Sequence, residues 1–258
     1  MELAKGRPMP MLTAYDWDLD LKAAYAVQRA LVKIRYGGLI PGGYKAGLTT
    51  ATARKKYFVR EPISGALPRA GRRADGAVIQ ADQFKNPMIE IELGFILRSP
   101  IRREMKSVSD LETYIRYAVP AVELPDVNYE KLNSITGLDL VATNIAASGY
   151  VIGKPFLLRR LAEVNTIRVT LTHDGKLIDE GMASNASGNQ LAALLWLVNH
   201  LVRQGYSLYP DQVLMTGALG KINPGLPGLS HAQYGNYGKL DFELKGPSAL
   251  AVTGPQRQ

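Results

Sequence analysis

The sequence predicts an α+β fold built as one integrated domain. One long amphipathic segment, residues 18–35, comes first, and short strand-like runs dominate after residue 87. A second helical segment, residues 191–202, lies among those strands. The chain has 258 residues, of which 46% are hydrophobic, so it is long enough to bury a sizeable core.

The predicted N-terminal part covers residues 1–86. Its helix spans residues 18–35, where apolar side chains recur at helical spacing and Asp18 or Asp20 can cap the first turn. Residues 41–86 are rich in glycine, proline and charge. This composition indicates a long active-site segment more than a packed sheet.

The predicted β core covers residues 87–245 and carries the candidate metal site. Residues 167–179 read as a hairpin that turns at Asp174 and Gly175. Further strands are predicted by short apolar runs at 212–216 and 238–244. Residues 246–258 are expected to form a loose tail.

Composition and charge exclude several classes of protein. The chain has no cysteine, which excludes thiolate metal sites and disulfide frameworks and fits a reducing cytoplasm. The net charge is +8, but the basic residues form scattered short clusters without a nucleic-acid-binding motif. They suit solubility or attraction of a small anion, so no nucleic acid is expected as a partner. No run is long enough to span a membrane and no signal peptide is evident, so we expect a cytoplasmic protein.

Three glutamates occupy unusual positions. Glu90 and Glu92 lie in the apolar run 88–97, and Glu123 lies in a second apolar run. Alternate residues of a strand share a face, so Glu90 and Glu92 would project together, about 6–7 Å apart. An E-x-E pair alone also fits the solvent face of a strand. Buried together, three carboxylates repel one another unless a cation binds, so they are candidate ligands of Mg²⁺ or Mn²⁺.

One further motif precedes these glutamates in the sequence, and three more follow them. They are Gly43-Tyr-Lys-Ala-Gly-Leu-Thr49, the segment 140–153 around Ala142-Thr-Asn144, the segment 213–219, and His231-Ala-Gln-Tyr-Gly-Asn-Tyr-Gly238. This ordered set resembles the fumarylacetoacetase superfamily over roughly residues 20–245. More narrowly, it is similar to the branch of 2-keto-4-pentenoate hydratases and 4-oxalocrotonate decarboxylases.

The resemblance implies a mixed β-roll or barrel with an N-terminal helical part. It also implies that Mg²⁺ or Mn²⁺ is held by Glu90, Glu92 and Glu123, and that Lys45 is a catalytic residue. Such enzymes are cytoplasmic homo-oligomers in meta-cleavage pathways of aromatic-compound catabolism. Lys45 would act as an acid or as a charge partner of the substrate.

Two positions depart from the pattern of this branch. Ile63 stands where the hydratases typically carry an aspartate, and Thr143 replaces the aspartate of the family's A-D-N segment. An aspartate can aim a water molecule and an isoleucine cannot, so Ile63 favours decarboxylation. We expect Ile63 to face the pocket and to desolvate a departing carboxylate. If it does not, Asp75 or Asp126 is the candidate acid for hydration.

The predicted function is a Mg²⁺- or Mn²⁺-dependent carbon–carbon lyase that decarboxylates a 2-oxo-enedioate through a metal-stabilised enolate. A small anionic 2-oxo acid would chelate the cation through its carboxylate and 2-oxo oxygens. The alternative is a hydratase that adds water to 2-hydroxypenta-2,4-dienoate through the same enolate. A further alternative is a repurposed, non-catalytic member of the family.

Other polar and glycine-rich positions are candidates for substrate binding or for ordinary turns. They are Leu48, Thr49, Ser148, Gly149 and Thr216. His231 has no carboxylate at metal-ligand spacing, and His200 is expected on the polar side of its helix.

Overall fold

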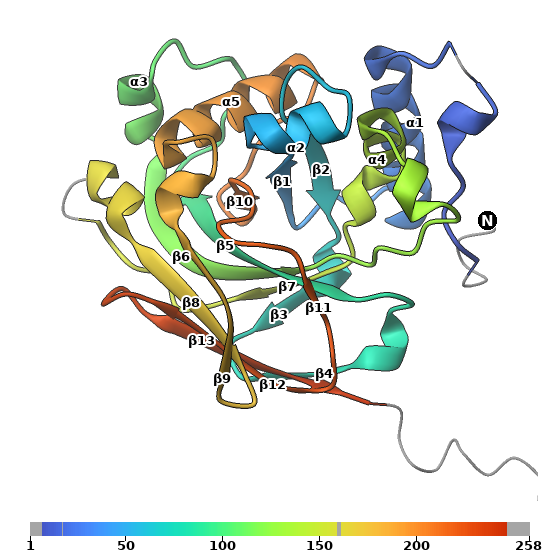
Figure 1. The fold of residues 1–258 in the computed structure, drawn as a ribbon. Coiled ribbons are helices and arrows are strands. Elements are labelled where there is room, and N and C mark those ends of the chain that lie inside the picture. Colours follow the sequence, from blue (N-terminus) through green and yellow to red (C-terminus); the bar gives the residue numbers. More distant parts are fainter. Residues whose placement is uncertain (1–6, 17, 159–160, 247–258) are drawn as a thin grey trace, which may run out of the picture.

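The computed structural model describes residues 7–16, 18–158 and 161–246 (Figure 1). Its strands are β1 Gly43–Gly47, β2 Ile63–Leu67, β3 Arg72–Ala74, β4 Ala77–Gln80, β5 Met88–Leu97, β6 Ile115–Leu124, β7 Gly149–Ile152, β8 Arg168–His173, β9 Lys176–Met182, β10 Val213–Met215, β11 Asn223–Pro224, β12 Gly228–Tyr234 and β13 Lys239–Lys245. One eight-stranded sheet has the order β2-β1-β10-β5-β6-β7-β3, with β11 paired to β5. A five-stranded sheet has the order β4-β13-β12-β8-β9.

The helices lie at the top of the view in Figure 1, near β1, β2 and β10, and the smaller sheet lies below. The helices are α1 Leu21–Arg35, α2 Ala51–Lys56, α3 Val108–Glu112, α4 Gly137–Ala142 and α5 Gln190–Arg203. Residues of α1 and α4 form one apolar cluster with Ile63 of β2. The mixture of helices with two curled sheets confirms the predicted α+β class.

The first helix begins three residues later than the sequence predicts. Asp20 is its N-cap, and its carboxylate accepts a hydrogen bond from the backbone N–H of Ala23 at 2.7 Å. This bond satisfies one of the free donors of the first turn. The helix ends before Gly37 and Gly38, whose φ angles of 59° and 77° lie in the left-handed region.

The predicted hairpin and second helix are both confirmed. Strands β8 and β9 pair antiparallel, and the turn between them has φ values of 47° at Asp174 and 77° at Gly175. Two left-handed residues are what a tight hairpin turn requires. Helix α5 is capped by Asn189, whose side chain accepts from the backbone N–H groups of Leu191 and Ala192 at 3.0 Å.

The expected position of His200 on α5 is wrong. Its side chain is buried, with a residue exposure of 5%. The ring stacks on Trp196 at 4.8 Å between centroids and lies 4.9 Å from the ring of Tyr25 on α1. The helical pattern alone does not reveal this, because α1 supplies the cover. Burial lowers the pKa of His200 to about 4.

The interpretation of residues 41–86 as loop rather than sheet is also wrong. They contribute β1 and β2 to the larger sheet, where β1 pairs parallel with β10, and they contribute β3 and β4 as well. Gly43 shows why the strand signal is weak: a Cβ there would lie 2.1 Å from the carbonyl oxygen of Val213. The close approach of the neighbouring backbone selects glycine over the β-branched residues that mark strands.

The two faces of β5 have different surroundings. Its odd-numbered residues, from Ile89 to Leu97, belong to the main apolar core with α5 and the smaller sheet. Its even-numbered residues, Glu90 to Ile96, face the opposite way. The candidate site therefore lies on the sheet face that points away from the main core.

The segments 1–86 and 87–245 share both sheets, since β1, β2, β3 and β4 pair with strands of the later segment or with each other. Of the expected tail, residues 247–258 lie outside the described residues. In the part of the chain that the structure describes, no helix combines the length and the apolar character needed to cross a membrane.

Candidate active site

The structure brings the three predicted glutamates together. Glu90 on β5 lies directly opposite Glu123 on β6 in the antiparallel register, and Glu92 is two residues further on the same face. One carboxylate oxygen from each of the three lies within 4.8 Å of the other two. Glu92 and Glu123 are 1% and 0% exposed, whereas Glu90 is half-buried.

This cluster fits a divalent cation. Burial raises the pKa of Glu92 well above its usual range, and the neighbouring Glu123 and Glu90 raise it further. Burial also raises the pKa of Glu123 to about 7, against the opposing effect of the Lys45 ammonium. Among the described residues, Oε2 of Glu123 has no hydrogen-bond partner. Like charges directly opposite in a sheet destabilise it, and hard oxygen donors suit Mg²⁺ or Mn²⁺, so the three carboxylates are a candidate divalent-cation site.

Glu92 is oriented by the backbone of Gly217. The N–H of Gly217 donates to Oε2 of Glu92 at 2.8 Å. Gly217 has a φ of 113°, and a Cβ there would lie 2.5 Å from Cγ2 of Thr49. Both the backbone conformation and the close approach require glycine. The Thr216-Gly217 pair thus contributes to the carboxylate cluster through the Gly217 N–H, which fixes the orientation of the Glu92 carboxylate.

Lys45 lies on β1 beside the glutamates and is only 2% exposed. Its Nζ forms an ion pair with Oε1 of Glu123 and donates a hydrogen bond to the carbonyl oxygen of Ile145 at 2.8 Å. The ammonium is therefore held by two oxygens at the edge of the carboxylate cluster. A buried cation so placed can stabilise negative charge on a bound oxygen or transfer a proton to it.

A strained turn carries the carbonyl that holds Lys45. Asn144, Ile145 and Ala146 have φ values of 61°, 50° and 53°, all in the left-handed region. Each such non-glycine residue costs about 1–2 kcal/mol. The Asn144 side chain holds the turn: its Oδ1 accepts from the N–H of Ala66 at 2.8 Å, and its Nδ2 donates to the carbonyl of Ala66 at 2.8 Å. The strained backbone conformation thus occurs at the turn whose Ile145 carbonyl oxygen points towards Lys45.

A cavity of about 350 Å³ opens next to the carboxylates. Besides the three glutamates and Lys45, its polar wall includes Thr49, Lys56, Tyr57 and Tyr129. Its apolar wall comprises mainly Val127, Leu132, Ile135, Leu140, Ile145 and Ile222. Within the described residues, no aspartate or histidine lines it. The cavity can therefore hold an aliphatic chain with one polar end at the cation site.

The predicted substrate-binding residues fall in two groups. Leu48 and Thr49 line the cavity, as the sequence suggests. Ser148, Gly149 and Thr216 do not line it. The Thr216 hydroxyl donates to the carbonyl of Leu93 at 3.2 Å and contacts Gln190, and a Cβ on Gly149 would lie 3.1 Å from the ring of Phe84.

Ile63 does not face the cavity, which corrects that expectation. It is 0% exposed and packs in the apolar cluster that includes Tyr25 of α1 and Val141 of α4. Ile63 pairs in register with Gly47, and its Cγ1 lies 3.6 Å from where a Cβ on Gly47 would stand. Ile63 thus shares the sheet face of Lys45 but lies one layer behind the cavity wall, because two helices cover it.

The other departure from the family pattern, Thr143, is also buried. Its hydroxyl donates to the carbonyl of Asp139 at 2.7 Å and shares a hydrogen bond with the Tyr129 hydroxyl at 2.8 Å. Tyr129 lines the cavity, so Thr143 acts on the wall through it. The two candidate acids for hydration lie elsewhere: Asp126 accepts from the N–H of Asn86 at 2.7 Å, and Asp75 accepts from the N–H of Asp241 at 2.7 Å.

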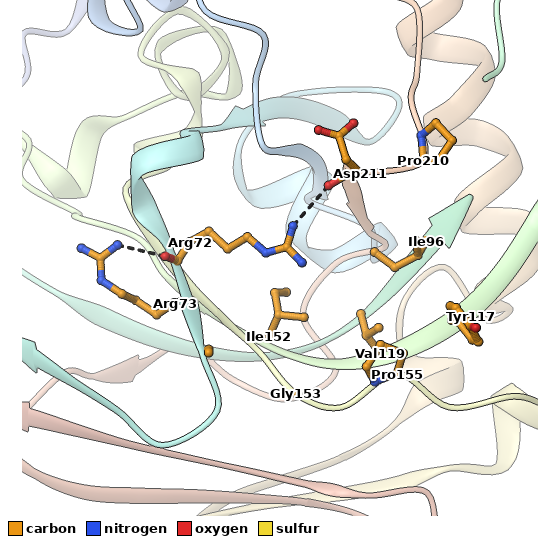
Figure 2. A pocket seen from close by; sticks show the side chains of 11 residues that line it. Arg72, Arg73, Ile96, Tyr117, Val119, Ile152, Gly153, Pro155, Pro210 and Asp211 are labelled. Atoms are coloured by element: carbon orange, nitrogen blue, oxygen red, sulfur yellow. Dashed lines mark hydrogen bonds between the residues drawn. The ribbon is translucent and has the colours of Figure 1, made fainter. Parts of the chain in front are cut away.

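A second cavity, of about 620 Å³, lies on the same face of β5 and β6. Figure 2 shows the side chains that line it. Its floor is apolar and comprises Ile96, Val119 and Ile152. Both arginines at its side donate to backbone carbonyls: Arg72 to Asp211 at 3.2 Å and Arg73 to Ala70 at 2.6 Å. Of the described residues, no buried carboxylate lines this cavity, so it lacks the chemistry of the first.

Sequence reasoning missed several residues of the first cavity. Lys56 belongs to the basic run Arg54-Lys-Lys56, which reads as a solvated surface. The signal that could have placed it is Thr50, whose hydroxyl caps α2 by accepting from the N–H of Ala53 at 3.1 Å. A helix that starts directly after the G-L-T segment carries its last residue back over the cavity. Asn144, which holds the turn of Ile145 without lining the cavity, gives no signal of this role, since three successive left-handed residues leave no pattern in a sequence.

Known proteins resemble this chain along most of its length. No protein-family model matches the chain. It is 32% identical over 205 residues to a 2-keto-4-pentenoate hydratase of Burkholderia vietnamiensis, covering 79% of this chain and 78% of that protein. The chain belongs to the 2-keto-4-pentenoate hydratase family. It is also 27% identical over 230 residues to a 2-oxo-hept-4-ene-1,7-dioate hydratase of Escherichia coli, covering 86% of each.

Solved structures confirm the predicted fold of this family member. A 4-oxalocrotonate decarboxylase from Pseudomonas putida G7, complexed with magnesium and adipate, superposes with a TM-score of 0.84 at 23% identity, over 93% of this chain and 92% of that one. A putative fumarylacetoacetate hydrolase family protein from Yersinia pestis superposes with a TM-score of 0.59 at 14% identity, over 78% of this chain and 90% of that one. The fold is that of the fumarylacetoacetase superfamily, and the family's enzymes are lyases.

Proposed function

We propose that this protein is a Mg²⁺- or Mn²⁺-dependent lyase that decarboxylates an unsaturated 2-oxo dicarboxylic acid such as 2-oxo-3-hexenedioate. The observation that carries the proposal is the convergence of Glu90, Glu92 and Glu123 beside Lys45 at one apolar cavity. Three clustered carboxylates, two of them fully buried, beside one buried ammonium are costly unless they bind a cation and an anionic ligand.

The reaction divides between the cation site and the protein's own groups. A cation held by the three glutamates supplies a Lewis acid for the carboxylate and 2-oxo oxygens of the substrate. The bond to the distal carboxylate breaks, its electron pair moves through the conjugated chain towards the C2 oxygen, and CO₂ leaves. Lys45 lies where its ammonium stabilises the charge that develops on that oxygen. Leu48 and Thr49 bind the substrate from the wall.

The lining of the cavity favours decarboxylation over hydration. Hydration needs a group that activates and aims water, whereas loss of CO₂ does not. In the described part of the chain, the glutamate ligands are the only carboxylates on the cavity wall, and no imidazole lies there. Ile63 does not bear on this choice, because it packs against α1 and α4 behind the wall.

Hydration of 2-hydroxypenta-2,4-dienoate is the second candidate. The named relatives at 31–32% identity are hydratases, including the TodF product hydratase of Pseudomonas putida. Both reactions would use the same cation site and the same lysine. Family membership and the complete set of charged groups argue against a non-catalytic role.

A direct assay decides between the two candidates. Purified protein with Mg²⁺ would be given 2-oxo-3-hexenedioate or 2-hydroxypenta-2,4-dienoate, with CO₂ release and loss of diene absorbance followed separately. We expect a higher kcat/KM for decarboxylation. Faster hydration of the dienoate would replace the leading proposal by the second, and no turnover of either compound would overturn both.

We also propose, from the family resemblance, that the enzyme works in the cytoplasm as a homo-oligomer during aromatic-compound catabolism. Its partner would be a small anionic 2-oxo acid rather than nucleic acid. Light scattering on the purified protein measures the oligomer, and a monomer at micromolar concentration would refute that part.

A further inference from the structure

Lys56 lies on the wall of the cavity that holds the glutamates. It is the last residue of α2, and its ammonium lies 5.1 Å from the centroid of the Tyr57 ring. Tyr57 lines the same cavity. The aromatic ring therefore holds an exposed ammonium next to the space that a substrate occupies.

Among the described residues, Lys56 differs from Lys45 in having no anionic partner. Lys45 is already engaged by Glu123 and by the Ile145 carbonyl. Across the described residues, no carboxylate forms an ion pair with Lys56, and its contact with Tyr57 leaves the N–H donors unused. Lys56 is thus an unpaired positive charge facing a cavity whose carboxylates are grouped at the cation site.

The wall around these charges is apolar. Its aliphatic residues are Val127, Leu132, Ile135, Leu140 and Ile222. A ligand that complements this cavity has an oxygen-rich head for the cation, an aliphatic middle and a second anionic end. A monocarboxylic 2-oxo acid would leave the ammonium without a partner.

We propose that Lys56 binds the distal carboxylate of a dicarboxylic 2-oxo acid and so selects diacids over monoacids. The inference rests on the proposed function, since the head of the ligand must occupy the cation site. Because Lys56 is exposed, the ion pair it forms is partly screened by water, and the expected preference is about twofold to fivefold.

The role of Lys56 is specificity rather than chemistry. An ammonium paired with a carboxylate stabilises the substrate, and it does so less once that carboxylate departs as neutral CO₂. Removal of Lys56 should therefore raise KM for the diacid without lowering kcat. If Lys56 had a merely structural role, its removal would weaken binding of the diacid and the monoacid equally and would alter KM and kcat together.

Calorimetric titration with two unreactive ligands of equal chain length tests the proposal. With Mg²⁺ present, wild-type protein would be titrated with 2-oxohexanedioate and with 2-oxohexanoate, which differ in the distal carboxylate. We expect Kd to be about twofold to fivefold lower for the diacid. Lys56→Met should abolish this preference by weakening diacid binding alone. Lys55→Met, a change at the neighbouring exposed lysine that does not line the cavity, should retain it.

The outcomes separate the inference from the function on which it rests. If wild type and Lys56→Met bind both ligands with the same ratio of Kd values, the role of Lys56 is refuted while the 2-oxo acid site stands. If Lys55→Met abolishes the preference as fully as Lys56→Met, the effect is one of general charge and the inference also fails. If wild type binds neither ligand with Mg²⁺, the proposed function itself fails.

Discussion

The two cavities on one face of β5 and β6 have opposite character. Near one end of the strand pair, Glu90 lies opposite Glu123, and near the other end Ile96 lies opposite Tyr117. The same backbone pairing and the same alternation serve both ends. The larger cavity, of about 620 Å³, lies at the apolar end, and the smaller, of about 350 Å³, lies at the carboxylate end.

The difference teaches that buried carboxylates without a protein partner, rather than a large cavity volume, mark the candidate site. At the apolar end, the Arg72 guanidinium is exposed and donates to the carbonyl of Asp211. At the carboxylate end, Glu92 and Glu123 are buried together, and Oε2 of Glu123 has no partner in the described part of the protein. A fold tolerates such an arrangement where a ligand relieves it.

Glu92→Gln should produce the largest effect, because it removes one charge of the cation site. We expect kcat/KM to fall at least about 10³-fold, since metal activation contributes several kcal/mol to catalysis. Without metal, the melting temperature should stay equal or rise, because a buried repelling carboxylate is gone. Steady-state kinetics and thermal unfolding measure the two effects. Wild-type activity in this variant would contradict the claim that the carboxylate end of the β5–β6 pair, and not the apolar end, is the active site.

Lys45→Met should lower kcat about 10²-fold, the usual size of an acid–base contribution. The affinity for Mn²⁺ should not fall, because the ammonium competes with a cation for Glu123. Kinetics and calorimetric titration separate these effects. Equal losses of activity and metal affinity would show that Lys45 only holds the glutamate in place.

His200 tests what burial does to a titrating group away from both cavities. Its pKa is lowered from 6.5 to about 4, so the unfolded chain takes up a proton at a higher pH than the folded one. The stability due to neutral His200 is complete above pH 6.5 and is lost as the pH falls towards 4. Between pH 7 and pH 5, wild type should lose about 2 kcal/mol through this group.

His200→Phe keeps the ring contacts with Trp196 and Tyr25 and cannot titrate. Urea unfolding at pH 7 and at pH 5 should show a loss smaller by about 2 kcal/mol than in wild type. Equal losses in the two proteins would mean that burial does not lower the pKa of His200, so that the imidazole of the folded protein is charged at pH 5.

Arg72→Met, at the apolar end, should have the smallest effect. Its hydrogen bond to the Asp211 carbonyl is exposed, so we expect activity within about twofold of wild type and stability within about 0.5 kcal/mol. Kinetics and thermal unfolding measure both. A tenfold loss of activity would show that the second cavity takes part in the reaction and would break the comparison.

The carboxylate cluster could be predicted from the sequence because its signal is local. Glu90 and Glu92 share a face through strand alternation, and an apolar run marks Glu123 as buried. Their meeting across β5 and β6 then follows from antiparallel pairing. The hairpin at Asp174-Gly175 was predictable for the same reason, since two left-handed residues fix the turn.

The surroundings of the site could not be predicted, because they depend on contacts between distant segments. Ile63 is buried by α1 and α4, and His200 is covered by Tyr25 of α1. Gly43 weakens the sequence signal of strand β1, because the close approach of the Val213 backbone selects glycine there over a strand-forming residue. The left-handed turn at Asn144 depends on hydrogen bonds to Ala66, which lies 78 positions away in the chain.

The central claim is that Glu90, Glu92 and Glu123 together hold one divalent cation. Anomalous diffraction at the manganese edge, from crystals grown with Mn²⁺, tests it most directly. We predict one strong peak with an oxygen of each glutamate at about 2.0–2.3 Å, and no peak in crystals of Glu123→Gln. A manganese peak away from these three carboxylates, or one that survives unchanged in Glu123→Gln, would contradict the claim.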